Sequence, residues 1–386
     1  MNDKRIAYVT GEYPKLSETF IEREICELRR KGFDVVVFAI REKENYEEAV
    51  YRAGLILRPL RLVRLFCAVM KLFMSDWSDG VSVCRKLYTI CNFAEEMKKR
   101  KVGHIHACFL SLPASMSYVI SAVTGIGYSV SGHARDVYVE NGGIEAKIKG
   151  AKFVTVCSES VRRYLHKFAD RVVTVYHGLP RELLKGDTYR KRGATKRMLI
   201  VGVGRLVEKK GFDVLLEAMA IFVRERRDGM LLIVGEGSEE KRLREICGRL
   251  GIGGWVQFCG SQEREAVLRI IAEATVLAVP SVVGRDGDRD GIANVILEAF
   301  AVRTAVVASS LESIREVVID GETGLLFEAG NAAELAERLL RIADDEVLRE
   351  KLVVNGESFV RKNFDGERNI EKLVTLFDEC LRGAGE

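Results

Sequence analysis

The sequence predicts an α/β fold with two Rossmann-like domains that face each other across a deep cleft. Two observations carry this prediction. The chain has 386 residues, about twice the usual length of a domain. Short β-branched runs also alternate with longer helical patterns along it, which is typical of parallel sheets covered by helices.

The predicted strands fall into two series. The first lies near residues 5–10, 34–40, 103–107, 127–131, 153–157 and 172–176, and the second near 198–203, 230–234, 255–258, 276–280, 305–308 and 324–327. We expect a first domain over 1–184, a polar linker over 185–197 and a second domain over 198–365. A last helical segment, about 366–386, lacks a following strand, so it either continues the second domain or packs back on the first.

Composition and the N-terminal sequence indicate which partners the protein has and in which compartment it lies. The chain carries 60 basic and 56 acidic residues, a net charge of +4 that is too balanced for a nucleic-acid footprint over the whole molecule. The nine cysteines form no C-x-x-C pair, and we expect reduced core thiols. Because the sequence runs from Met1 directly into a strand-like segment, without an apolar signal core, we expect a cytoplasmic protein.

The segment 280–299 is the most informative one. A strand ends at Pro280, a polar loop follows, and a helix is expected to start near Ala293. Asp290 would then precede a helix N-terminus, where unpaired N–H groups favour an anionic ligand, and Glu298, two turns on, could point back to the same pocket. Ionised carboxylates are good acceptors for the hydroxyl groups of a sugar.

The acidic residues of this segment allow three other interpretations. A calcium loop starting at Asp286 fails, because its twelfth position is Leu297 instead of the required glutamate. Asp286 and Asp288 could form a D-x-D metal site for a diphosphate. Asp290 could simply cap the helix.

A basic turn follows the first strand of the second series. In the segment 201–211, Gly204 forms part of a glycine turn, and Arg205 and Lys210 could converge on one diphosphate. Fixed cations stabilise the negative charge that develops on a departing diphosphate. The alternative is a solvated loop, since a bare G-x-G is a weak signal.

In the first domain, His133 stands at the carboxyl end of a predicted strand, where doubly wound sheets bind ligands. Its imidazole can exchange hydrogen bonds with a sugar hydroxyl. His104 and His106 fit a structural role better, and Tyr176-His177-Gly178 fits a simple turn. Ser17 and Glu18 follow the first strand and could touch phosphate or acceptor, with solvent exposure as the alternative.

Residues 55–73 form a basic, apolar segment. Arg58, Arg61, Arg64 and Lys71 interrupt a run of Leu, Ile, Val and Phe, and on a helix they would share one face. Four charges argue against a membrane span and are compatible with a helix lying on an anionic surface. An ordinary helix that docks on the first sheet is the alternative.

Together these segments resemble the retaining glycosyltransferase family 4, which has the two-domain GT-B fold. The stretch Pro14-Lys15-Leu16-Ser17-Glu18-Thr19-Phe20-Ile21, with His104-Ile105-His106-Ala107 and Gly132-His133-Ala134-Arg135-Asp136, is similar to the branch that builds bacterial exopolysaccharides such as colanic acid. The family's Glu-x7-Glu motif maps onto Asp290 and Glu298, so this chain has Asp where Glu is usual.

The resemblance implies the roles of the site residues. Glu298 would hold the nucleotide ribose, and Asp290 with the backbone of Gly291, Ile292 and Ala293 would hold the sugar. Arg205 and Lys210 would clamp the diphosphate, and His133 would contact the sugar. Gly204 and Asn294 complete the expected donor-binding set. His133, Arg205, Lys210 and Asp290 form the expected catalytic set. Members of the family generally need no metal, so no cofactor is expected, and the donor is a substrate.

We therefore expect a hexosyltransferase that uses a UDP- or GDP-sugar and a glycan or lipid-linked acceptor, with no nucleic-acid partner. If the segment 55–73 lies on a membrane, the protein would sit peripherally on the inner face of the cell membrane. The rivals are a nucleotide-sugar epimerase or hydrolase of the same fold and a non-catalytic nucleotide-sugar-binding protein.

Overall fold

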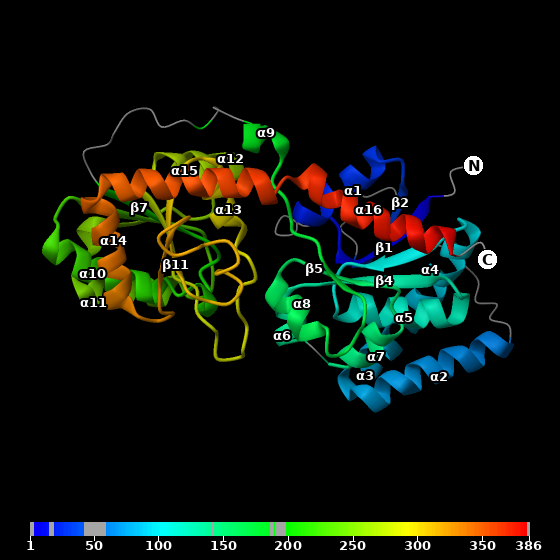
Figure 1. The fold of residues 1–386 in the computed structure, drawn as a ribbon. Coiled ribbons are helices and arrows are strands. Elements are labelled where there is room, and N and C mark those ends of the chain that lie inside the picture. The colour runs from blue at the N-terminus through cyan, green and yellow to red at the C-terminus, as the bar shows by residue number, and fades with distance from the viewer. Residues whose placement is uncertain are drawn as a thin grey trace. The chain divides into compact units, whose positions relative to one another are not determined.

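The computed structural model describes residues 4–14, 19–41, 59–140, 142–185, 189 and 198–383. The chain forms two compact units, residues 1–177 with 367–386, and residues 178–366. Each unit contains a six-stranded parallel sheet with helices around it (Figure 1). The predicted α/β class with two Rossmann-like domains is confirmed, and the deep cleft between them stays a prediction. The predicted linker 185–197 lies almost entirely outside the described residues.

The first unit has the strand order β2-β1-β3-β4-β5-β6. Its strands are β1 (Arg5–Glu12), β2 (Asp34–Arg41), β3 (His104–Ala107), β4 (Gly127–Gly132), β5 (Val154–Val156) and β6 (Val172–Thr174). Its helices are α1 (Thr19–Arg30), α2 (Pro59–Ser75), α3 (Trp77–Arg85), α4 (Leu87–Lys99), α5 (Leu112–Thr124), α6 (Ala134–Tyr138), α7 (Ile144–Lys149), α8 (Glu159–Leu165) and α16 (Gly366–Arg382).

Alternate residues of β1 feed two different cores. Ala7 and Val9 belong to a cluster that includes side chains of α2, α4 and α5, whereas Ile6 and Tyr8 belong to a second cluster with α1 and α16. This alternation follows from the two-residue period of a strand. The sheet is therefore buried on both faces, as parallel sheets usually are.

The last helix, α16, packs on the first unit. Leu373 and Phe377 are buried beside Ile6 and Tyr8. The ammonium group of Lys4 adds an ion pair with Asp378 at 2.9 Å. Of the two placements that the sequence left open, the structure shows the return to the first unit. Residues 178–184, which the sequence analysis gave to the first domain, lie in the second unit.

The second unit has the strand order β12-β11-β10-β7-β8-β9. Its strands are β7 (Met198–Val203), β8 (Gly229–Val234), β9 (Val256–Phe258), β10 (Val276–Val279), β11 (Ala305–Ser309) and β12 (Leu325–Phe327). Its helices are α9 (Arg181–Lys185), the 3-10 turn η2 (Glu208–Lys210), α10 (Phe212–Glu225), α11 (Glu240–Leu250), the 3-10 turn η3 (Gly253–Trp255), α12 (Arg264–Glu273), α13 (Asn294–Ala301), α14 (Ala332–Asp344) and α15 (Glu346–Asn363).

The order in which the chain adds strands to the sheet of the second unit reverses between β7 and β10. The chain adds β8 and β9 on one side of β7 and then crosses to place β10 on the other side. In doubly wound sheets, ligands bind at the carboxyl ends of the strands where the order reverses. A ligand site is therefore expected at the loops that follow β7 and β10.

All nine cysteines are free, but the expectation of core thiols is wrong for several of them. Cys108 and Cys247 are buried, whereas Cys26, Cys67 and Cys84 are exposed on α1, α2 and α3. An apolar stretch on a surface helix also covers outward-facing positions, which the sequence alone does not separate from core positions. None of the helices in the described residues is long and apolar enough to cross a membrane.

Candidate functional site

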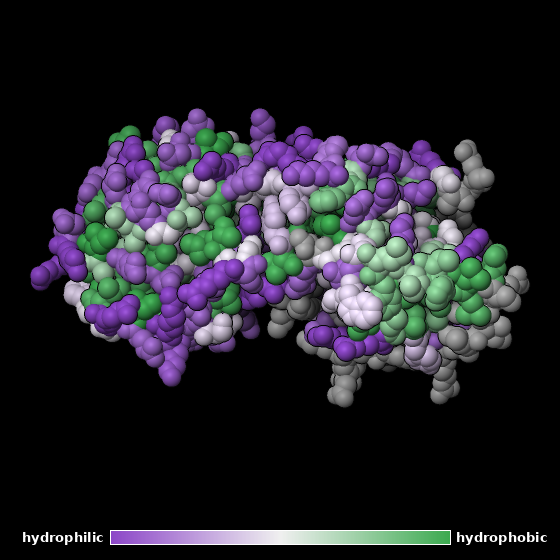
Figure 2. Space-filling view, turned by 90° about the horizontal axis from the view of Figure 1, so that it is seen from below, coloured by the Kyte–Doolittle hydropathy of each residue, from purple (hydrophilic) through white to green (hydrophobic). Residues whose placement is uncertain are grey.

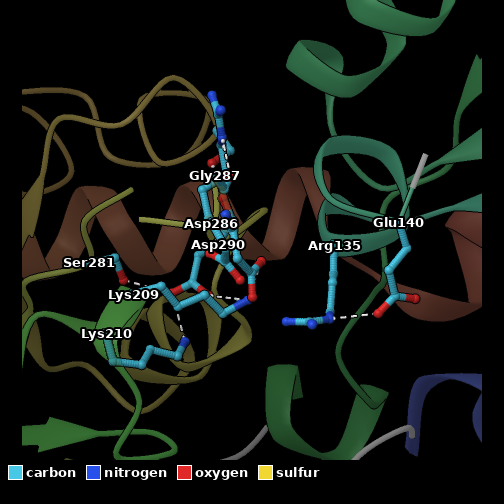
Figure 3. A network of polar contacts seen from close by, with 11 residues as sticks. Arg135, Glu140, Lys209, Lys210, Ser281, Asp286, Gly287 and Asp290 are labelled. Atoms are coloured by element: carbon cyan, nitrogen blue, oxygen red, sulfur yellow. Dashed lines mark hydrogen bonds and ion pairs between the residues drawn. The ribbon is translucent and has the colours of Figure 1, made fainter. Parts of the chain in front are cut away.

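The loops after β7 and β10 meet through Lys210 and Asp290. Lys210 Nζ donates to Asp290 Oδ2 at 2.7 Å, and Ser281 Oγ donates to the same oxygen at 2.7 Å (Figure 3). Ser313, in the turn after β11, donates from its Oγ to the main-chain oxygen of Asp290 at 2.8 Å. Three segments therefore fix the position of this one aspartate.

Lys209 makes a second, more deeply buried ion pair beside the first. Its Nζ donates to Asp288 Oδ1 at 3.0 Å and lies 3.7 Å from Asp290 Oδ1. The side chains of Lys209 and Asp288 are only 10 % and 9 % exposed. The sequence analysis did not single out Lys209. The two adjacent lysines give the same signal in the sequence, and both side chains at the end of the short 3-10 turn η2 reach the carboxylates of the loop after β10.

The two loops also approach each other through their backbones. Val282 N donates to Lys209 O at 2.8 Å. Gly211 has φ +61, and a Cβ atom at this position would lie 2.0 Å from Pro280 O. A side chain at 211 therefore cannot fit unless the backbone moves. This close contact holds the basic turn (204–211) against the loop between β10 and α13 (280–293), called the acidic loop below.

The surroundings of Asp290 keep its carboxylate ionised. Burial alone raises the pKa of Asp290. The ammonium groups of Lys210 and Lys209, together with the hydrogen bonds from Lys210 and Ser281, outweigh burial and hold the pKa below its usual value. The site thus combines two fixed carboxylates, those of Asp288 and Asp290, with two cations in a largely water-excluded place.

The acidic loop ends at the N-terminus of α13. Ala293 is the N-cap residue and makes no side-chain cap. Alanine is among the poorest N-cap residues, so the first N–H groups of the helix are left for another acceptor. Gly291 and Ile292 lie directly before this end and Asn294 is the first helical residue. Asp290 is therefore not the cap of α13, which removes that alternative.

Gly204, Arg205 and Glu298 are further predicted site residues, near Lys210 and Asp290 in the sequence. Gly204 directly follows β7 and Arg205 comes next, with an exposed side chain. Glu298 lies on α13 and accepts a hydrogen bond from Arg264 Nε at 3.4 Å on Glu298 Oε1. The structure thus joins Lys210 and Asp290 directly and places Arg205 in the same basic turn. The functional roles of all these residues stay predictions.

Asp286 closes the tip of the acidic loop. Its Oδ1 accepts the N–H of Asp288 at 2.9 Å, and Gly284 N donates to Asp288 O at 2.7 Å. Lys209 occupies one oxygen of Asp288, as described above. In the part of the chain that the structure describes, no group of three or more His, Cys, Asp or Glu side chains is arranged to hold a metal ion. The expectation of a metal-independent protein stays a prediction.

In the first unit, His133 follows β4 and is the N-cap residue of α6. Its ring lies between aromatic side chains, with centroids 4.9 Å from Phe20, 4.8 Å from Phe109 and 5.4 Å from His177. Burial lowers the pKa of His133 to about 4, so the imidazole is neutral near pH 7. A neutral imidazole can both donate and accept a hydrogen bond.

Asp136 holds the backbone of His133 and was not found from the sequence. Its carboxylate accepts the N–H of His133 and the N–H of Leu110, both at 2.6 Å. Burial raises the pKa of Asp136 to about 7, against the lowering effect of these hydrogen bonds. The spacing of three residues between His133 and Asp136 is the available signal, since it is that of a capping pair.

His104 and His106 are buried as well. His104 Nε2 and His106 Nδ1 each lie 2.8 Å from Ser129 Oγ, which satisfies them inside the sheet. His177 stacks on His133 with an interplanar angle of 8°, so it is more than a turn residue. Ser17 and Glu18 lie outside the described residues.

With this geometry in view, comparison with known proteins places the second unit in a family. Residues 187–359 match the family described as Glycosyl transferases group 1. The second unit is a group 1 glycosyltransferase domain. Lys209, Lys210, Asp288 and Asp290 all lie within the matched residues of this domain. The resemblance to a glycosyltransferase is thus confirmed, and the exopolysaccharide branch stays a prediction.

Curated relatives of the chain are glycosyltransferases. A phosphatidyl-myo-inositol mannosyltransferase of Mycobacterium leprae is 37 % identical over 42 % of this chain and 42 % of its own length. An uncharacterized glycosyltransferase of Methanocaldococcus jannaschii is 24 % identical over 60 % of each chain. The chain thus spans about half the length of the curated relatives it matches.

Solved structures share the fold over nearly the whole chain. A sucrose-phosphate synthase from Thermosynechococcus elongatus has a TM-score of 0.73 at 19 % identity, covering 98 % of this chain and 100 % of its own. HepE of Anabaena, solved in complex with UDP, has a TM-score of 0.74 at 16 % identity, covering 97 % of this chain and 100 % of its own. The group 1 domain is therefore combined with a first unit of a matching fold.

Proposed function

We propose that the chain is a retaining glycosyltransferase that moves a hexosyl unit from a UDP- or GDP-sugar to a glycan or lipid-linked saccharide acceptor. The observation that carries this proposal is the contact between Lys210 and Asp290 at the carboxyl ends of β7 and β10, next to the uncapped N-terminus of α13. Cations and free N–H groups suit a diphosphate, and a fixed carboxylate suits sugar hydroxyls.

The names of similar proteins support a nucleotide-sugar donor. The Anabaena protein was solved with UDP, and a relative from Corynebacterium glutamicum is named as a GDP-mannose-dependent mannosyltransferase. Both bases therefore remain in the proposal. The mannosyltransferase names also support a hexosyl unit as the transferred group.

Lys210 can serve the carboxylate and the diphosphate together. An ammonium group has three N–H donors, and one of them is directed to Asp290 Oδ2. We assign the remaining donors of Lys210, together with Arg205 from the same turn, to the phosphate oxygens and the sugar. The same assignment covers the main-chain N–H groups at Gly291, Ile292, Ala293 and Asn294. Glu298 is assigned to the ribose and Gly204 to close approach of the backbone.

Asp290 has one oxygen left for the sugar. Its Oδ2 accepts from Lys210 and Ser281, whereas Oδ1 lies 3.7 Å from Lys209 Nζ, beyond hydrogen-bond distance. We assign Oδ1 to a sugar hydroxyl and the neutral imidazole of His133 to another. Because aspartate is one methylene shorter than the glutamate usual in the family, its carboxylate reaches the sugar differently, and we assign no particular hexose.

The proposed reaction needs no protein nucleophile. The bond between the anomeric carbon and the diphosphate oxygen breaks while the acceptor hydroxyl oxygen bonds to the same face. The acceptor proton goes to the departing diphosphate, which leaves as UDP or GDP. Arg205 and Lys210 stabilise the charge that grows on this leaving group. We place the protein in the cytoplasm or on the inner face of the cell membrane, with residues 55–73 as the membrane contact.

A thermal-shift screen over UDP- and GDP-sugars tests the donor, because a ligand that prefers the native state raises its stability. Turnover with an acceptor and analysis of the anomeric configuration then test the chemistry. A transferred sugar with the donor's anomeric configuration supports the proposal. Epimerised or hydrolysed donor without transfer supports the enzymatic rivals, and binding without turnover of any kind supports a binding protein. If no nucleotide-sugar shifts the melting temperature, the donor assignment is wrong.

A further inference from the structure

Large apolar side chains gather on the outer face of α2. Leu62, Val63, Phe66, Met70 and Met74 are between 41 % and 86 % exposed. Figure 2 shows a broad hydrophobic surface on the side of the molecule where Figure 1 draws α2. A helix that only docks on the sheet would present polar residues to water at these positions.

The opposite face of α2 is packed in the core of the first unit. Ala68, Val69 and Leu72 are buried in the same cluster as β1 and α5. Successive residues of a helix turn by about 100°, so the exposed apolar residues, with exposed Leu60 included, span roughly 160° and the buried ones lie outside this arc. The docking alternative of the sequence analysis thus holds for the buried face, and α2 has a second apolar face that no described part of its unit covers.

Trp77, the first residue of α3, extends the apolar face. Its side chain is 74 % exposed, and its ring lies 5.0 Å from the ring of Phe73. An indole group has a large apolar body and a polar N–H, and it is enriched where proteins meet the boundary between lipid and water. An exposed tryptophan in contact with Phe73, at the end of a helix that exposes Phe66 and Met74, therefore favours a lipid partner.

The charges on α2 have a single sign. Its sequence, PLRLVRLFCAVMKLFMS, contains three cations and no acidic residue. Arg64 and Lys71 are exposed and fall at the edge of the apolar arc, whereas Arg61 is half-buried nearer to the core face. Lys71 Nζ also lies 5.9 Å from the ring centroid of Tyr118. Arg58 lies outside the described residues.

This distribution fits an anionic lipid surface better than a second copy of the chain. In a symmetric dimer the same patch meets itself, so Arg64 and Lys71 would approach their own copies without an acidic residue of α2 to pair with. At an anionic bilayer the same cations meet lipid phosphates while the apolar residues enter the acyl boundary.

We propose that the outer face of α2, together with Trp77, inserts into an anionic lipid surface with the helix axis parallel to the membrane plane. Lipid phosphates contact Arg64 and Lys71, and Phe66, Met70 and Trp77 enter the interface. The inference names a membrane-binding face and does not depend on the transferase activity. It would hold the protein where a lipid-linked acceptor is found.

Vesicle flotation without nucleotide or acceptor tests this inference. Vesicles of phosphatidylcholine and phosphatidylglycerol in equal parts should bind the full chain, and vesicles of phosphatidylcholine alone should bind it more weakly. The double variant Phe66→Ser with Met70→Ser should lose on the order of 100-fold in binding, because two large side chains no longer leave water. Val347→Ser with Val354→Ser changes two exposed apolar residues of α15 and should bind like the wild type.

The charges are tested separately. Arg64→Gln with Lys71→Gln should lose roughly 25-fold on the anionic vesicles, because each cation near such a surface is worth about fivefold. Lys241→Gln with Arg249→Gln, on exposed positions of α11, should bind like the wild type. In a Trp255→Phe background Trp77 is the remaining tryptophan of the two, and its emission should shift to the blue on the vesicles.

Three results would overturn the inference. The first is that anionic vesicles do not retain the wild type, and the second is that the Phe66/Met70 variant binds as well as the control variant. A lipid-free dimer that the same variant abolishes would assign the face to a second copy. Lys210→Met should bind vesicles like the wild type, so failure of the membrane face and failure of the proposed donor site are distinguishable.

Discussion

Lys210 Nζ lies 2.7 Å from Asp290 Oδ2, although the two residues are 80 positions apart in the chain. The contact exists because β7 and β10 are neighbours in a parallel sheet, so the loops at their carboxyl ends share one edge. Ser281 and Lys209 complete the environment of the carboxylate. This buried cluster is the part of the second unit that is best suited to an anionic, hydroxyl-bearing ligand.

Lys209→Met should lower the free energy of unfolding more than it lowers the rate of sugar transfer. The change leaves Asp288 charged and buried without its ammonium partner, which typically costs about 3–5 kcal/mol in the free energy of unfolding. Urea denaturation measures this loss. Adding Asp288→Leu to the same variant should restore part of the stability, because no uncompensated charge then remains. A loss below about 1 kcal/mol in the single variant would show that the pair is not buried as described.

Gly211→Ala should destabilise the protein more than Gly251→Ala. Both glycines have positive φ, +61 and +69, which costs an alanine about 1 kcal/mol or more. A Cβ atom at 211 would also collide with Pro280 O, whereas nothing lies within 4 Å of one at 251. Thermal melting of the two variants should therefore differ, and donor binding should weaken only in Gly211→Ala. Equal losses would exclude a tight contact between the two loops.

Four histidines of the first unit should stay neutral down to about pH 5. Burial lowers the pKa of His104, His106 and His177 to about 3 and that of His133 to about 4. Histidines in the unfolded chain take up protons below about 6.5, so these four contribute less stability as pH falls through that value. Ring nitrogen shifts followed by NMR between pH 8 and about 5 should be flat for these residues. Titration of His133 near pH 6.5 would contradict its burial.

Two buried acids act in the opposite direction on stability. Burial raises the pKa of both Glu24 and Asp136 to about 7, so the stability they contribute at low pH is lost as pH rises through that value. Because the four histidines outnumber the two acids, we expect the melting temperature to fall as the pH is lowered from about 6.5 to about 4, the range set by the histidine pKa shifts.

Arg205→Ala should lower kcat by about 10²- to 10³-fold if the guanidinium stabilises the leaving diphosphate. Its side chain is exposed, so the fold should be unaffected. Arg249→Ala, on an exposed position of α11, is the matched control and should keep the wild-type rate. A changed KM with an unchanged kcat would assign Arg205 to ground-state binding instead.

The sequence was sufficient for the strands and for the position of Lys210 and Asp290 at strand ends, whereas the roles of the site residues stay predictions. Each predicted strand is present because its apolar run is bounded by turn residues, and the placement of Lys210 and Asp290 follows from their positions after neighbouring strands. Lys209 and Asp136 were missed because their contacts depend on the direction of a side chain in the short turn η2 and in the five-residue helix α6. The docking of α16 was open because an amphipathic pattern does not name the surface that it packs against.

The central claim is that the cation and carboxylate after β7 and β10 form a nucleotide-sugar site, and calorimetric titration with UDP and GDP tests it most directly. Lys210→Met should weaken binding of the preferred nucleotide by about 10- to 100-fold, the usual contribution of a charge-assisted hydrogen bond, while Lys241→Met on α11 should bind like the wild type. Equal affinities for the wild type and Lys210→Met would contradict the account.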